Sequence, residues 1–218
     1  MNEKEVLDGV VGTLGDGRKV LGKHWSFNLR NDPKRLGFVL SRYTFCAKMG
    51  CAGKSVIELG CSEGIGTPIL SESATRYHGV DLDGPAIETA KQNFENEKCI
   101  FTEADFLGKR FGAFDTVISM DVIEHIPAEQ EGLFFRTVID NMGEDGICIV
   151  GTPNITASAY ASPASQIGHI NLYSADRLAS VFRKYFHTVF QFGINDEVVH
   201  TGYAPMAHYI VCVGCYKK

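Results

Sequence analysis

Short apolar runs alternate with helix-like stripes along most of this chain. The runs are rich in β-branched and other apolar residues, as buried strands are, and they lie at residues 54–59, 77–83, 99–102, 114–120, 146–154, 186–193 and 207–215. Helical spacing of apolar residues is found at residues 65–73, 84–95, 133–142 and 174–182, and again after Pro33. This alternation predicts an α/β fold with a doubly wound, mostly parallel seven-stranded sheet, whose final hairpin makes the last strand antiparallel.

The first strand runs directly into a glycine-rich turn and then a helix. Gly60, Gly64 and Gly66 permit positive φ angles and a close approach of the backbone to a ligand. The free amides at the start of the helix face the crevice at the carboxyl ends of the strands. By itself the turn fits equally well a tight strand-to-helix connection that binds nothing.

Two acids downstream of this turn favour a ligand. Asp81 ends the second strand, where a carboxylate can accept hydrogen bonds from both hydroxyls of a ribose. Asp105 follows the third strand and offers a carboxylate to an exocyclic amine, while the adjacent Phe106 offers an aromatic face to a purine. The surroundings are acidic and lack the Gly-x-Gly-x-x-Gly spacing of a pyrophosphate loop. A cationic or zwitterionic adenosine cofactor is therefore expected.

This arrangement resembles the S-adenosylmethionine site of class I methyltransferases, whose first motif is acid-x-Gly-x-Gly-x-Gly and whose second strand ends in an acid. The resemblance implies a Rossmann-like methyltransferase fold and S-adenosylmethionine as the cofactor. Ser62 stands where the family has its middle glycine, which indicates a reshaped loop, because serine tolerates many turn conformations. The residues implied to contact the cofactor are Glu58, Gly60, Cys61, Gly64, Asp81, Leu82, Asp105, Phe106 and Met120.

A second resemblance precedes the first strand. The segment Asn31-Asp-Pro-Lys-Arg-Leu-Gly-Phe38 is similar to the one before the first motif in the ubiquinone-biosynthesis O-methyltransferases. In that group an arginine at the place of Arg35 meets the cofactor carboxylate, a task that suits a bidentate guanidinium. The alternative is a surface arginine on a helix.

Residues 1–32 contain several glycines, no sustained apolar period and few strong helix formers. This pattern predicts a mobile N-terminal arm or partial lid. Trp25 either covers the ligand pocket and excludes water from it, or merely anchors the arm to the core.

The fourth strand runs into Asp121-Val-Ile-Glu-His125-Ile-Pro127. A similar Glu-His-Ile-Pro segment occurs in many class I methyltransferases. In some of them, including the ubiquinone O-methyltransferases and the small-RNA 2′-O-methyltransferases, acid-x-x-Glu-His binds a divalent ion. Two interpretations follow from the resemblance. One is a divalent metal site built from Asp121, Glu124, His125 and His169. The other, which we favour, is a metal-free site in which Glu124 is hydrogen-bonded to backbone and one of the two histidines is the catalytic base.

His169 lies in a long stretch, residues 155–173, that is rich in alanine and serine and has no clear period. Such a stretch inside a compact domain is usually a functional loop, and we expect an active-site insertion here. A histidine has an ordinary pKa near 6.5 and so suits a base for a hydroxyl acceptor. The alternative role for His169 is a hydrogen-bonding tether.

Length, charge and composition bear on the number of domains, the kind of binding partner and the cellular location. A length of 218 residues suits one domain spanning residues 1–218. The net charge of −5 argues against broad affinity for nucleic acid or anionic membranes, although it does not exclude an RNA substrate. With no apolar segment of membrane-spanning length and an acidic start, we expect a cytoplasmic protein.

The expected activity is S-adenosylmethionine-dependent methyl transfer to a hydroxyl or amine of a small polar metabolite or biosynthetic intermediate. Two alternatives stay open: a nucleic-acid or protein methyltransferase that acts with a partner, and a non-catalytic cofactor-binding regulator. A basic surface cluster would favour the first alternative, and a closed loop without an acceptor pocket would favour the second. The sequence leaves the acceptor and the oligomeric state undetermined.

Overall fold

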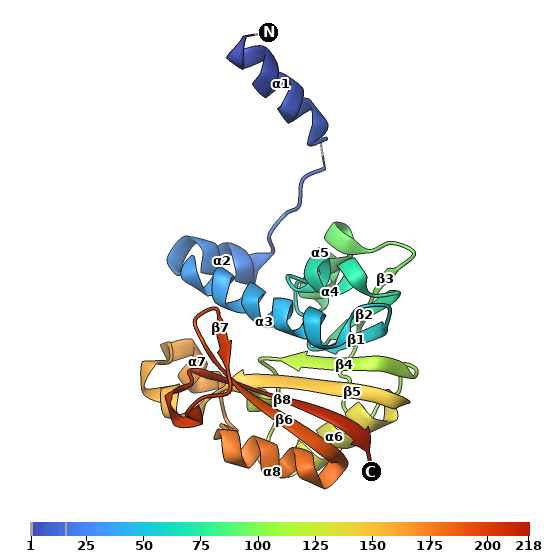
Figure 1. Ribbon diagram of the computed structural model, residues 1–218, viewed down its shortest axis with the longest axis vertical. Helices are drawn as coiled ribbons and strands as arrows, with labels where there is room; N and C mark the ends of the chain where they lie inside the picture. The colour runs from blue at the N-terminus through green and yellow to red at the C-terminus, as the bar shows by residue number, and fades with distance from the viewer. Residues whose placement is uncertain (1, 16) are drawn as a thin grey trace.

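The computed structural model describes residues 2–15 and 17–218 (Figure 1). Within these residues the strands form an eight-stranded sheet in the order β3-β2-β1-β4-β5-β8-β6-β7. The strands are β1 (Ser55–Leu59), β2 (Arg76–Asp81), β3 (Cys99–Glu103), β4 (Phe114–Met120), β5 (Met142–Pro153), β6 (Phe186–Asn195), β7 (Val198–His200) and β8 (Tyr209–Lys217).

The sheet is parallel on one side and antiparallel on the other. Strands β3, β2, β1, β4 and β5 pair in parallel, whereas β8 lies antiparallel between β5 and β6. This confirms the predicted α/β fold with an antiparallel last strand. The predicted count of seven strands was wrong, because β7 folds back on β6 as a further edge strand. Its three residues are too few to give a readable alternation in the sequence.

Helices cover both faces of the sheet (Figure 1). On one face α3 (Lys34–Gly50), α4 (Thr67–Ser73) and α5 (Gly84–Phe94) contribute Val39, Leu70 and Ile87 to a buried apolar cluster. On the other face α6 (Glu131–Asp140) and α8 (Ala175–Tyr185) contribute Phe134 and Phe182 to a second cluster. The two clusters fix the sheet and hold the carboxyl ends of the parallel strands together at one edge.

Two segments contain more helix than the sequence indicated. The N-terminal segment forms α1 (Glu3–Thr13) and α2 (Lys23–Asn31), and residues 155–173 contain η3 (Ile155–Tyr160) and α7 (Pro163–Gly168). The remaining short helices are η1 (Ile123–His125), η2 (Ala128–Gln130) and η4 (Ala204–Met206).

Capping explains part of this difference. Asn2 and Glu5 form a capping box at the start of α1, and the Ser162 side chain caps α7. A search for apolar periodicity does not detect such local hydrogen bonds. Helix α1 has no buried residue and lies apart from the sheet (Figure 1). No helix in the described part of the chain combines the length and the apolar character that a membrane crossing requires.

Candidate active site

The turn after β1 is held in an unusual backbone conformation. Gly60, Ser62 and Gly64 have φ angles of +88°, +48° and +73°. A side chain at Gly60 would place its Cβ 2.2 Å from Cγ2 of Val122, so this position has no room for one. The Ser62 amide donates a hydrogen bond of 2.8 Å to Oδ2 of Asp81, which joins the turn to the end of β2. The serine therefore adopts the left-handed conformation that the family's glycine would adopt more easily.

A pocket of about 370 Å³ opens over this turn, at the carboxyl ends of β1, β2 and β4; we call it the inner pocket. Many of the residues predicted to bind the cofactor line it. They are Trp25, Arg35, Gly60, Cys61, Asp81, Leu82, Phe106 and Met120. The tertiary structure thus brings together residues from α2, from α3 and from the carboxyl ends of β1, β2, β3 and β4 or just after them.

A second pocket of about 680 Å³, the outer pocket, lies beside the first. It is bounded by α2, by the start of α5, by His125 and by residues of the 155–173 segment. The two pockets share four lining residues: His24, Asn28, Arg35 and His125. The two pockets therefore adjoin at these residues.

Three of the predicted cofactor residues, Glu58, Gly64 and Asp105, lie outside both linings, and their roles toward the cofactor stay predictions. Glu58 is fully buried and accepts hydrogen bonds from the hydroxyls of Tyr43 at 2.7 Å and Tyr77 at 2.5 Å. Burial raises the pKa of Glu58 to about 7. It therefore supports the wall of the inner pocket from behind.

Gly64 and Asp105 also make contacts within the protein. The position of Gly64 faces Phe94 and Ala90, so this glycine allows α5 to pack closely against the turn. Asp105 is exposed, and its carboxylate accepts a hydrogen bond from the Leu107 amide at 3.1 Å. Its side chain is engaged in a local turn instead of facing the inner pocket.

The two candidate catalytic histidines lie against each other. Their ring centroids are 5.1 Å apart in an edge-to-face arrangement. Nδ1 of His125 lies 2.9 Å from the carbonyl oxygen of Gly168, and because a carbonyl can only accept, Nδ1 carries the proton. Nε2 of a neutral His125 is then free to accept one. Burial and the neighbouring His125 lower the pKa of His169, so its neutral form is favoured.

Glu124 lies behind this pair in a fully buried position. Its Oε2 accepts a hydrogen bond of 2.8 Å from the Thr152 hydroxyl, while its Oε1 has no partner among the described residues. Burial, and next the charge of Asp121, raise the pKa of Glu124 to about 8. The buried carboxyl is thus favoured in its protonated form at neutral pH.

Three of the four candidate metal ligands come together. Ligand atoms of Glu124, His125 and His169 lie within 4.8 Å of one another. One oxygen and two nitrogens fit a divalent ion, and the unpartnered Oε1 of Glu124 is a suitable donor. Asp121 is not part of this group, because both its carboxylate oxygens contact Arg42.

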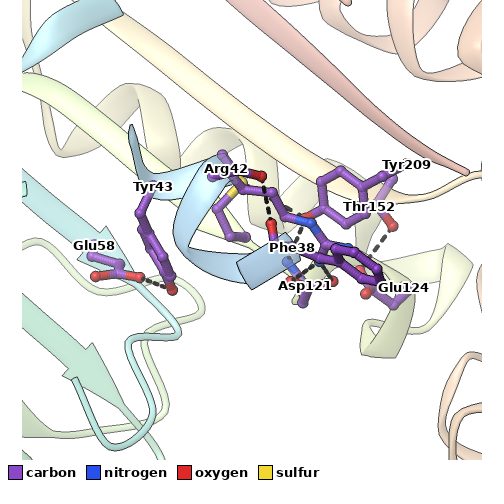
Figure 2. Close-up of polar contacts among 10 residues, drawn as sticks. Phe38, Arg42, Tyr43, Glu58, Asp121, Glu124, Thr152 and Tyr209 are labelled. Atoms are coloured by element: carbon purple, nitrogen blue, oxygen red, sulfur yellow. Dashed lines mark hydrogen bonds and ion pairs between the residues drawn. The ribbon is translucent and has the colours of Figure 1, made fainter. Parts of the chain in front are cut away.

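Sequence reasoning missed Arg42 and Tyr209. Figure 2 shows the guanidinium of Arg42 between Asp121 and the Tyr209 ring. Its NH1 lies 2.9 and 3.1 Å from the two oxygens of Asp121, and its Cζ lies 3.7 Å from the ring centroid. A usable signal was present: Arg42 comes three residues after Val39, on the side of α3 that faces the core, where a charge requires a partner.

Comparisons with known proteins indicate the family and the fold. A family model described as "Methyltransferase domain" matches residues 32–186. The ubiquinone biosynthesis O-methyltransferase of Glaesserella parasuis serovar 5 is 28% identical over 138 residues, which are 59% of this chain and 56% of that protein. The chain therefore spans little more than half the length of this curated relative.

Two solved structures share the fold. A TehB-like SAM-dependent methyltransferase from Corynebacterium glutamicum has a TM-score of 0.67 at 17% identity, over 90% of this chain and 97% of that one. A methyltransferase solved in complex with the Haloferax volcanii Trm112 methyltransferase activator has a TM-score of 0.69 at 14% identity, over 88% and 95%. Because the family model matches well over half of the chain and includes the ends of β1, β2 and β4, this protein belongs to the methyltransferase domain family.

Proposed function

We propose that this protein transfers the methyl group of S-adenosylmethionine to a hydroxyl, or an amine, of a small polar molecule. The observation that carries the proposal is the meeting of the two pockets at His24, Asn28, Arg35 and His125. A cofactor in the inner pocket with its ribose at Asp81 extends toward this junction, where an acceptor in the outer pocket can reach the methyl carbon.

The inner pocket offers suitable groups for the parts of the cofactor. Asp81 accepts amide hydrogens from Ser62 and Asp83, one on each oxygen, and each oxygen keeps a further lone pair for a ribose hydroxyl. Leu82 and Phe106 provide apolar surface for adenine. The guanidinium of Arg35 has no ion pair or hydrogen bond within the described part of the chain, so it is available to the cofactor carboxylate.

The reaction is an in-line displacement. The acceptor oxygen or nitrogen attacks the methyl carbon, the bond from carbon to sulfur breaks, and the sulfur keeps the electron pair. Alignment and the exclusion of water contribute most of the rate, and Trp25 on α2 covers the inner pocket for this purpose.

His125 is our choice for the base that receives the acceptor proton. It lines both pockets, and Gly168 holds its Nδ1 so that Nε2 accepts. Of the inner and outer pockets, His169 lines the outer one alone, and we assign it to positioning the acceptor. A hydroxyl acceptor is supported by the name of the ubiquinone biosynthesis relative.

The outer pocket also bears on the alternative functions. A regulator without catalysis needs no acceptor site, whereas this chain has a pocket of about 680 Å³ beside the inner one. This favours an enzyme that binds a small acceptor directly.

Two measurements test the proposal. Titration calorimetry is expected to show binding of S-adenosylmethionine and S-adenosylhomocysteine. Cofactor with a labelled methyl group is then incubated with separate metabolite, RNA and protein fractions, and label is expected in small metabolites. Absence of binding would exclude the cofactor assignment, and label confined to RNA or protein would exclude the small-molecule acceptor.

A further inference from the structure

Helix α3 presents two consecutive polar side chains to two neighbouring strands. Tyr43 donates a hydrogen bond of 2.7 Å to Glu58 in β1, and Arg42 donates to Asp121 immediately after β4 (Figure 2). These strands pair in parallel, with Glu58 beside Ile118. One turn of α3 thus fixes two adjacent walls of the inner pocket.

The pair of Arg42 and Asp121 is confined from several sides. The Arg42 side chain is 16% exposed and that of Asp121 is 30% exposed. The Tyr209 ring lies under the guanidinium, and the Asp121 amide donates to the carbonyl of Gly151 at 3.1 Å and to the Tyr209 hydroxyl at 3.2 Å. Asp121 also has a φ of +55°, a left-handed conformation that a side chain rarely adopts without support. The carboxylate is therefore held in one place.

The position of the Asp121 carboxylate matters because the cofactor carries a positive charge. The inner pocket is lined by two acids, Asp81 and Asp121. Asp81 lies at the end that we assign to the ribose, whereas Asp121 precedes η1, which carries His125 to the junction of the pockets. A methyl group that passes through this junction brings its sulfonium, and hence a positive charge, to the Asp121 end.

We infer that Arg42 is a positioning residue that neutralises Asp121 and so prevents this carboxylate from becoming the counterion of the sulfonium. The inference rests on the function proposed above. During transfer the positive charge of the sulfur disappears as the methyl group moves to the acceptor. An unpaired carboxylate beside the sulfur would stabilise the charged ground state more than the transition state, which slows the chemical step.

The test compares the charged cofactor with its neutral thioether product. Calorimetry gives the Kd of S-adenosylmethionine and of S-adenosylhomocysteine for the wild type, Arg42→Met, Asp121→Asn and the double variant. Arg42→Met leaves the Asp121 carboxylate without its partner. We therefore expect the affinity for S-adenosylmethionine, relative to that for S-adenosylhomocysteine, to rise on the order of tenfold. Asp121→Asn leaves the guanidinium unpaired and shifts the preference the opposite way. In the double variant, the ratio of the two Kd values is expected to be close to that of the wild type.

Kinetics provide a second readout. Arg42→Met is expected to lower both kcat and the KM for S-adenosylmethionine, because the ground state is bound too well. A purely structural role would weaken both ligands equally and raise KM. Arg76→Met is the matched control, since Arg76 also stacks on an aromatic ring, that of Phe114, but lines neither pocket.

The outcomes separate this inference from the proposed function. A wild-type protein that binds neither ligand refutes the function itself. A wild type that binds both, with a ratio unchanged in Arg42→Met and in Asp121→Asn, refutes the role of Arg42. If Arg42→Met does not fold, Asp121→Asn alone decides, because an unchanged ratio in that variant is incompatible with charge masking.

Discussion

The inner and outer pockets differ in how their walls are supported. Behind the inner pocket, Glu58 is held by two buried tyrosine hydroxyls and Asp121 by a stacked arginine. The outer pocket is lined in part by exposed side chains of α2, such as Phe27, which is 58% exposed. Its other walls come from the start of α5 and from the 155–173 segment.

This difference indicates different tasks. Buried hydrogen bonds fix the inner walls in advance, which suits one recurring ligand with charges at known places. Peripheral helices and loops tolerate changes of shape and sequence, which suits an acceptor that differs from one enzyme to another. The residues of the junction belong to both pockets, and changes there are expected to have the largest effects.

Loss of the base that we propose, His125, is the largest expected effect. His125→Ala should reduce kcat by about 10² to 10⁴-fold, the usual contribution of general base catalysis. His169→Ala, confined to the outer pocket, should raise the KM for the acceptor more than it lowers kcat. Steady-state kinetics with an identified acceptor measure both constants. If His169→Ala instead causes the large loss of kcat, His169 is the base and His125 positions the acceptor. If kcat and KM are unchanged in both variants, neither histidine takes part in the mechanism.

The next effect tests the preformed inner wall through its pH dependence. Burial raises the pKa of Glu58 from its ordinary 4.5 to about 7, so the folded state binds the proton more tightly than the unfolded state. The stabilisation is complete below the ordinary pKa and is lost as pH rises through about 7, a change of about 3 kcal/mol. Glu58→Gln should flatten this part of the stability profile.

Denaturant unfolding at pH values from about 4 to about 8 measures how the free energy of unfolding depends on pH. This range includes the ordinary and the raised pKa of Glu58. Glu88→Gln is the control, because Glu88 is a glutamate on the exposed surface of α5 and should leave the slope unchanged. An identical slope in the wild type and in Glu58→Gln would show that Glu58 titrates normally.

A smaller effect concerns the ribose end of the inner pocket. Asp81→Ala removes the acceptor that we propose for the ribose hydroxyls and should weaken S-adenosylhomocysteine binding by about 1 to 3 kcal/mol. Asp140→Ala is a matched control, since this acid is exposed, lines neither pocket and is not a predicted site residue. Calorimetry measures the affinity of both variants for S-adenosylhomocysteine. An equal affinity in Asp81→Ala and in the wild type would show that Asp81 does not bind the cofactor.

The smallest expected effect is that of metal removal. Arg42 already occupies both oxygens of Asp121, and burial raises the pKa of Glu124 to about 8, which disfavours the ionised carboxylate that an ion would require. We therefore expect turnover to be unchanged after exhaustive chelation. Turnover that vanishes and returns on addition of magnesium, manganese or zinc would instead assign Glu124, His125 and His169 as metal ligands.

The sequence by itself determined the α/β fold, the antiparallel last strand and most of the inner pocket. These features depend on local patterns: β-branched runs, a glycine turn with positive φ, and acids at strand ends. Asp81, Phe106 and Met120 line the inner pocket because the carboxyl ends of neighbouring parallel strands necessarily meet at one edge.

Only the tertiary structure decided which acids line the inner pocket. Glu58 and Asp121 look alike in the sequence, each at or near the end of a central strand, yet one is fully buried and the other lines the inner pocket. The difference comes from α3, whose Tyr43 contacts Glu58 across 15 residues of the chain and whose Arg42 contacts Asp121 across 79 residues. Burial and pairing are properties of contacts between distant segments, and a local pattern carries no information about which partner a buried charge will find.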